Sequence, residues 1–125
     1  MIKTPPVPTP PDEISRKGLW EILVPTTRND GRPFHTRYHR VWDREVERIS
    51  GGMTLMPVAN GRWTAPDGTR YAERMIPVRI LATRDEMSRI VDYTIRYYEQ
   101  LAVLAYEISS NVILRAAPAA REKAR

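Results

Sequence analysis

Four short stretches of the chain are predicted to form strands, and in three of them the residues expected on the two faces alternate along the stretch. The stretches are residues 19–25, 53–58, 71–82 and 102–108. In the first, one side carries Trp20, Ile22 and Val24, and the other carries Leu19, Glu21 and Leu23. In the last, the side expected to face inward carries Leu104, Tyr106 and Ile108, and the outward side carries Val103, Ala105 and Glu107. The pattern therefore predicts four strands.

Two further stretches have helical spacing. From Phe34 onward, apolar residues recur every three or four positions until Gly51 and Gly52, which are typical of a helix end. A capping box predicts the start of the second helix, because Thr83 is followed by Glu86 three residues later. It is predicted to end near Gln100. Its apolar stripe comprises Met87, Ile90, Val91, Thr94, Tyr98 and Leu101.

Turn dipeptides separate the second and third strands. Asn60-Gly61 and Asp67-Gly68 both favour turns, so the connection is either a hairpin with its tip at Asp67 or a kinked hairpin with Trp63 packed inside it. We favour the tip at Asp67-Gly68. After the last strand, residues 109–111 interrupt the apolar pattern, and residues 112–114 are either an extra edge strand or a continuation past a bulge.

The resulting order is strand, helix, strand, strand, helix, strand. This is the split βαβ or ferredoxin-like arrangement, an α+β fold with a four-stranded antiparallel sheet and two helices on one face. The other face should carry Leu19, Leu23, Met75, Leu81 and Val103. Such a face is too apolar to lie wholly in water, so we expect a second copy of the chain to cover it as a homodimer.

Length and composition set the limits. The 125 residues fit a single domain, predicted over residues 18–114, with a proline-rich flexible arm at 1–17 and a basic flexible tail at 115–125. The absence of cysteine excludes disulfides and thiolate sites. No apolar run suits a membrane span and no signal-peptide core is present, so we expect a soluble, cytoplasmic protein.

The net charge of +5 at first favours a nucleic-acid partner. Most of that charge lies at the two ends, however, and residues 18–114 are left with a net charge of only +1. A stripe along the first helix remains as a candidate surface for nucleic acid or an acidic protein: Arg37, Arg40, Arg44 and Arg48. Interspersed acidic residues favour a solvated face with ion pairs instead. Nucleic acid is therefore the less favoured partner.

His35, His39 and Asp43 follow one another at intervals of one helical turn. The spacing suits a shared metal ion, but such pairs are common on exposed helix faces, and we interpret both histidines as surface or capping residues. No P-loop, dinucleotide fingerprint or catalytic triad order occurs. We therefore predict no metal site and no cofactor.

The open sheet face offers the sharper candidate. Alternation places charged residues on the side away from the helices, amid apolar neighbours, and the candidate ligand-binding residues are Glu21, Glu73, Met75, Arg79 and Glu107. Carboxylates and a guanidinium in a partly covered apolar cavity would have shifted pKa values, as functional sites often do. The alternative interpretation is an ion-pair network across a dimer interface, which shifts pKa values equally well.

The topology and the open apolar face resemble the small dimeric α+β-barrel proteins of the ferredoxin-like superfamily over about residues 19–114. The segments 51–55 and 61–63 are also similar to segments of uncharacterised bacterial proteins. Members of the superfamily include cofactor-free monooxygenases, isomerases and small-ligand sensors. The resemblance implies a small-molecule-binding homodimer first, a cofactor-free enzyme using proton transfer or oxygenation second, and an interaction module third, since fold alone does not fix function.

Overall fold

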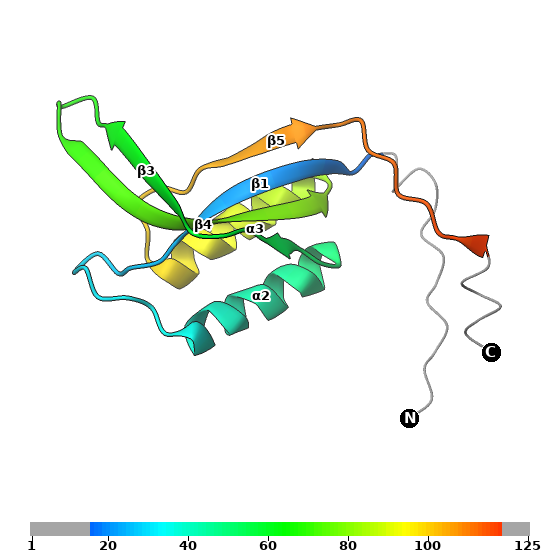
Figure 1. Cartoon of the computed structure of the whole chain (residues 1–125), viewed down its shortest axis with the longest axis horizontal. Coiled ribbons are helices and arrows are strands. Elements are labelled where there is room, and N and C mark those ends of the chain that lie inside the picture. Colours follow the sequence, from blue (N-terminus) through cyan, green and yellow to red (C-terminus); the bar gives the residue numbers. More distant parts are fainter. Residues whose placement is uncertain (1–15, 119–125) are drawn as a thin grey trace.

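The computed structural model describes residues 16–118, in which two helices cover one face of an antiparallel sheet (Figure 1). The elements in chain order are β1 (Gly18–Pro25), α2 (Thr36–Ser50), β2 (Thr54–Leu55), β3 (Ala59–Thr64), β4 (Arg70–Ala82), α3 (Arg84–Tyr98) and β5 (Ala105–Ser109). The strands are ordered β2-β4-β1-β5, and β3 pairs with the remaining half of β4. The predicted ferredoxin-like α+β fold is confirmed.

Strands β1 and β4 form the centre of the sheet. They pair antiparallel over the whole of β1 without a register shift, from Gly18 opposite Ala82 to Pro25 opposite Met75. Residues opposite one another point to the same face, so Trp20 lies with Ile80 and Ile22 with Val78 on the helix side. The alternation predicted for residues 19–25 is therefore correct, as is that of residues 75–82, whereas Ala72, which the same alternation assigns to the core side, is exposed in the hairpin.

Both helices begin and end close to the predicted positions. Gly51 ends α2 with φ 100°, a conformation that suits glycine. The capping box of α3 is formed: the Glu86 amide donates to Thr83 Oγ1 at 3.1 Å and the Thr83 amide donates to Glu86 Oε1 at 2.8 Å. Because α3 ends at Tyr98, Leu101 lies beyond the helix and is fully exposed, which corrects its expected place in the core stripe.

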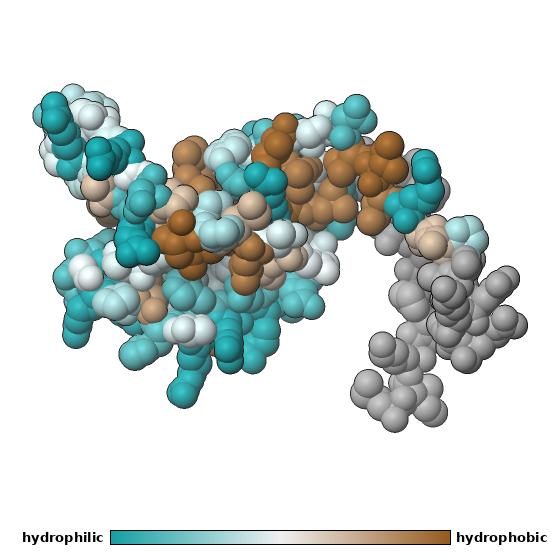
Figure 2. Space-filling view, viewed as in Figure 1, coloured by the Kyte–Doolittle hydropathy of each residue, from teal (hydrophilic) through white to brown (hydrophobic). Residues whose placement is uncertain are grey.

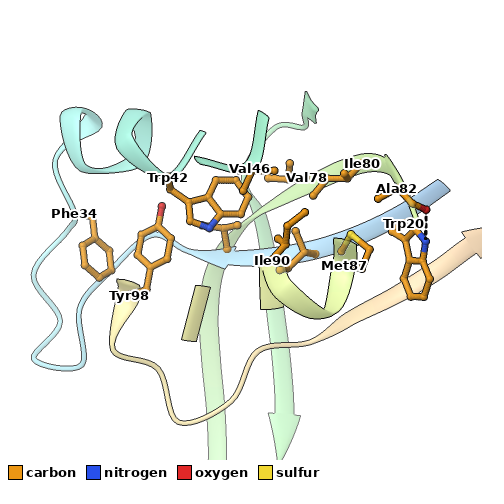
Figure 3. Packing of buried hydrophobic residues seen from close by; sticks show 12 residues of the cluster. Trp20, Phe34, Trp42, Val46, Val78, Ile80, Ala82, Met87, Ile90 and Tyr98 are labelled. Atoms are coloured by element: carbon orange, nitrogen blue, oxygen red, sulfur yellow. Dashed lines mark hydrogen bonds between the residues drawn. The ribbon is translucent and has the colours of Figure 1, made fainter. Parts of the chain in front are cut away.

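The core lies between the helices and the sheet (Figure 3), and each of its two tryptophans has a hydrogen-bond partner. Trp42 donates through Nε1 to Thr94 Oγ1 at 2.9 Å, and Trp20 donates to the Ala82 carbonyl at 3.1 Å. Pairing of this kind matters because a buried polar atom without a partner is costly. Within residues 16–118 no buried side-chain nitrogen or oxygen lacks one.

The second predicted strand is divided into two elements. Residues 53–58 were expected to form one strand, but β2 covers only Thr54–Leu55 and β3 starts at Ala59, after Pro57. Proline has no amide hydrogen for the ladder, and it falls in this gap. The β3–β4 hairpin then projects beyond the rest of the sheet, with its tip at Asp67-Gly68 as predicted (Figure 1). Trp63 is not packed inside it but is 48% exposed and stacked on Tyr71.

The orientation predicted for the last strand is wrong. Val103 and Ala105 pack against the core, whereas Leu104, Tyr106 and Ile108 are exposed. Tyr106 lies opposite Glu21 and Glu107 lies opposite Trp20, and the register shifts at a bulge between Leu19 and Trp20. Ala105 lies opposite Ile22, which faces the core, so the register with β1 turns Val103 and Ala105 inward and Leu104 and Tyr106 outward. In the described part of the chain, residues 112–114 form no strand.

The predicted arm at 1–17 and tail at 115–125 fall largely outside the described residues. Their assignment, and with it the domain boundary, stays a prediction. Neither helix of residues 16–118 combines the length and apolar character needed to cross a membrane.

Candidate functional site on the open sheet face

Three side chains from neighbouring strands meet on the face of the sheet opposite the helices, which we call the open face. Arg79 of β4 donates through Nε to Glu21 Oε1 at 3.2 Å, and Tyr106 of β5 donates through its hydroxyl to Glu21 Oε2. The pairing explains this contact, because both Arg79 and Tyr106 lie directly opposite Glu21. The Glu21 side chain is only 12% exposed, so its two oxygens are held by two donors at the sheet surface.

Apolar side chains surround these three residues. By alternation, Leu19 and Leu23 of β1 and Leu81 of β4 point to the open face, where each is half-buried. Leu104 extends the row, since its carbonyl accepts a hydrogen bond from the Leu23 amide, and its side chain is exposed. Figure 2 shows hydrophobic surface over β5 and the segment that follows it. The polar trio therefore lies within an apolar surface.

The Glu21 carboxylate changes the pKa of the neighbouring Tyr106 hydroxyl. The hydrogen bond to Glu21 raises the pKa of Tyr106, because ionisation would place a second negative charge beside the carboxylate. Tyr106 therefore remains a neutral donor, and Glu21 is the acceptor. Arg79 uses its Nε for Glu21 and is 44% exposed, so its terminal amino groups face outward. The trio can offer a ligand both an acceptor carboxylate and a guanidinium donor.

The other sequence-predicted site residues are not part of this cluster. Glu73 and Met75 share the open face of β4 but belong to the hairpin half of the strand, opposite Gly61 and Ala59. Glu73 lies six residues from Arg79 along β4, which corresponds to about 20 Å. It lines a pocket of about 200 Å³ on the hairpin.

Glu107 faces the helix side, opposite Trp20, near the start of β1. The structure thus brings together Glu21 and Arg79 from the predicted set, and adds Tyr106. Sequence reasoning assigned Tyr106 to the core because large apolar residues usually face inward. The signal that it missed was the other set of alternating residues, Val103 and Ala105, which are also apolar and which pack against the core.

The arginine stripe of α2 has no common partner. Arg48 is bound to Glu45, with Nη2 and Oε1 at 2.5 Å, and the charge of Arg40 acts on Asp43. Arg37 lies at the start of the helix and is exposed. Arg40 and Arg48 thus take part in local interactions, as expected of a solvated helix face, whereas Arg37 forms no ion pair among the described residues. Its role toward an anionic partner stays a prediction.

The two histidines have different environments. His35 occupies the N-cap position of α2, makes no side-chain capping bond and is exposed. His39 was expected at the surface but is half-buried, with Nδ1 at 2.6 Å from the Tyr98 hydroxyl. Burial lowers the pKa of His39 and raises that of Asp43, four residues later. Residues 16–118 contain no group of three or more side chains suited to hold a metal ion.

Together, fold and site define a small α+β protein with a polar trio on an open, apolar sheet face. No known protein family matches the sequence, and no curated protein is detectably similar to it. Solved structures do match its shape. A phage SAM lyase in complex with S-methyl-5'-thioadenosine superposes with a TM-score of 0.57 at 11% identity, covering 75% of this chain and 90% of the lyase.

Divalent cation tolerance proteins are similar as well. CutA from Xylella fastidiosa gives a TM-score of 0.56 at 12% identity, covering 86% of this chain and 92% of its own. The protein from Thermus thermophilus gives 0.53 at 10% identity, covering 85% and 92%. At such low identity these likenesses establish the shared ferredoxin-like fold and carry no residue roles.

Proposed function

We propose that this protein is a homo-oligomer that binds a small molecule at the open face, around Glu21, Arg79 and Tyr106. One observation carries the proposal: a carboxylate that is only 12% exposed holds two donors in the middle of an otherwise apolar sheet face. Polar groups converging in an apolar surface are the usual composition of a ligand site. A purely structural ion pair at an exposed surface would contribute little to stability.

A second copy of the chain is the cover that this face requires. Exposed apolar side chains continue along β5 and the segment after it: Leu104, Ile108, Val112, Ile113 and Leu114. β5 is also an edge strand, pairing only with β1 among the described elements, so its outer hydrogen-bonding groups are open to a partner. Packing this surface against a copy of itself would remove it from water and enclose the polar trio between the two sheets.

The ligand class follows from the site and from one structural neighbour. An acceptor carboxylate and a donor guanidinium suit a molecule with hydroxyl or amino groups and an apolar body, and leucines flank them. The phage lyase of the same fold is a complex with S-methyl-5'-thioadenosine, a ligand of that kind. We propose an adenosine-type thioether as the ligand class, with Glu21 accepting from its hydroxyl or amino groups and Arg79 orienting it.

The test is a titration of the purified full chain with S-methyl-5'-thioadenosine, in which binding is measured by calorimetry and by the shift in melting temperature. Binding should be lost or weakened at least about tenfold in Glu21→Gln and Arg79→Ala, since each removes a charge-assisted hydrogen bond. Glu107→Gln is the matched control, because that carboxylate lies on the helix side. Equal affinity in all three variants, or no binding by the wild type, would contradict the proposal.

An enzyme acting by proton transfer is the second candidate. The observation that favours it is the Tyr106 hydroxyl held against Glu21, a proton donor and an acceptor in direct contact. If the site is catalytic, wild-type protein should consume S-adenosylmethionine, followed by chromatography, while Tyr106→Phe retains binding and loses turnover. Absence of any product at high protein concentration would leave binding alone as the function.

A further inference from the structure

We propose that a groove at the start of α2 binds an aromatic phosphate monoester, at a site separate from the open face. The groove has a volume of about 600 Å³, within the range typical of small-molecule sites. Its walls come from the loop after β1, the first turns of α2 and the end of α3, and comprise Arg28, His35, Thr36, Arg37, Tyr38, Val41 and Tyr97. These segments lie on the helix side of the sheet, so the inference does not depend on the proposed function.

Stacked aromatic rings from α2 and α3 form the apolar wall of the groove. The rings of Tyr38 and Tyr97 stack with centroids 4.2 Å apart and planes inclined by 26°. Each hydroxyl is tied to the opposite helix: Tyr97 donates to the Tyr38 carbonyl at 2.8 Å, and Tyr38 donates to the Tyr97 carbonyl. Val41 is exposed beside them although it belongs to the apolar stripe of α2. Tyr38 also stacks on Phe34 and Tyr97 on Tyr93, so a planar aromatic ring of a ligand would pack against the edges of this stack and against Val41.

Two guanidinium groups give the groove its charge. Arg28 lies over aromatic rings, with Cζ 4.6 Å from the centroid of Phe34 and 5.2 Å from that of Tyr38. Phe34 is itself fixed, since it packs edge-on against Tyr98 at the end of the core (Figure 3). Within residues 16–118, neither Arg28 nor Arg37 forms an ion pair, and no carboxylate lines the groove. The nearby Asp30 is bound to Arg32, at 2.8 Å.

Arg28 differs from the arginines that form ion pairs in the described part of the chain. Arg32, Arg48 and Arg79 each form an ion pair with a carboxylate of their own. Arg28 is instead preorganised by aromatic contacts and forms no ion pair among residues 16–118, although its charge also acts on the nearby Asp30. A preorganised guanidinium in an apolar setting is a good anion receptor, because little side-chain entropy is lost on binding.

The charge favours phosphate over carboxylate. A phosphate monoester carries about −1.5 to −2 charges at neutral pH and three acceptor oxygens, which matches two guanidinium forks and the Thr36 hydroxyl. A carboxylate has one charge and two oxygens, so a single arginine satisfies it. The apolar wall then accounts for the aromatic part of the ligand.

Three molecules with the same ring test the assignment: 1-naphthyl phosphate, 1-naphthoate and 1-naphthol, each titrated into the full chain by calorimetry. We expect the phosphate to bind about tenfold or more tightly than the carboxylate, and the naphthol to bind weakest. Arg37→Gln should weaken binding of the phosphate by about tenfold or more. Arg37 is exposed and forms no ion pair among residues 16–118, so this variant also tests the site if Arg28→Gln is destabilised.

Arg40→Gln is the matched control, because Arg40 lies on the same helix, is exposed and does not line the groove. Its affinity for 1-naphthyl phosphate should stay within about twofold of the wild type. Equal binding of naphthol and naphthyl phosphate would overturn the proposal, as would equal effects of Arg37→Gln and Arg40→Gln. A preference for naphthoate would overturn the assignment to phosphate, and absence of binding by all three would overturn the site.

Discussion

The two faces of the sheet have opposite relations to the rest of the chain. On the helix side, Ile22, Val24, Val78 and Ile80 are almost fully buried beneath α2 and α3. On the open face, the residues between them in sequence are half-buried at best, and Arg79 and Tyr106 are exposed. Both faces carry large apolar side chains. The difference teaches that residues 16–118 cover only one face of the sheet and leave apolar side chains of the other face half-buried or exposed.

The largest expected effect on stability comes from the helix side of the sheet. Trp42 is 1% exposed and bonded to Thr94, so Trp42→Ala should lower the free energy of unfolding by about 3 to 5 kcal/mol. The free energy of unfolding is measured by urea denaturation, with circular dichroism as the signal. Trp63→Ala is the matched control: Trp63 is 48% exposed and stacked on Tyr71, and its loss should cost no more than about 1 kcal/mol. Similar costs for the two tryptophans would break the comparison between covered and uncovered surface.

The next effect concerns self-association through the open face. Leu104→Asp places a charge on the apolar surface expected to meet a second copy, and should weaken self-association at least about tenfold without unfolding the exposed site. Sedimentation velocity over a concentration series measures this. Leu101→Asp is the control, because Leu101 is fully exposed after α3. If the wild type sediments as a monomer at every concentration, the open face is not an interface between copies.

The smallest effect is the pH dependence at the end of the core. The unfolded pKa of His39 is near 6.5, and burial lowers the folded value. Below pH 6.5 the unfolded state therefore takes up the proton more readily, so this contribution to stability falls as the pH falls through that value. Asp43, whose pKa burial raises, acts in the opposite sense at lower pH, since the folded state holds its proton more tightly.

His39→Gln should consequently flatten the loss of stability between about pH 7.5 and about pH 5.5, measured as the urea midpoint at each pH. His35→Gln serves as the control, because that side chain is exposed and makes no capping bond. A pH profile unchanged by the loss of His39 would show that its contact with the Tyr98 hydroxyl does not couple protonation to folding.

Sequence reasoning succeeded where one physical rule governed a whole segment. The apolar alternation of β1 predicted its buried side, the Thr83 and Glu86 pair predicted the start of α3, and Gly51 predicted the end of α2. It also placed Glu21 and Arg79 on one face, and they form an ion pair.

It failed where several rules competed. The side of β5 that faces the core follows from its register with β1, which places Ala105 opposite the buried Ile22, and residues 102–108 alone do not specify that register. The sequence places Tyr97 on the flank of the second helix, where it could line a groove, although core packing is the favoured interpretation. Its stack with Tyr38, 59 positions away, does not follow from the sequence, because that contact depends on how α2 packs against α3.

The bulge opposite Trp20 has a consequence for how much information the sequence must supply. In a strand ladder without a bulge, side chains alternate between the two faces, so the one open question is which of the two alternating sets of residues faces the core. The eight pairs between β1 and β4 have no register shift, so a single choice places every side chain of that ladder. The β1 and β5 ladder has four pairs and a shift, so it needs two independent choices, one on each side of the bulge. Tyr106 and Ser109 are thus specified separately, and correct placement of one carries no information about the other.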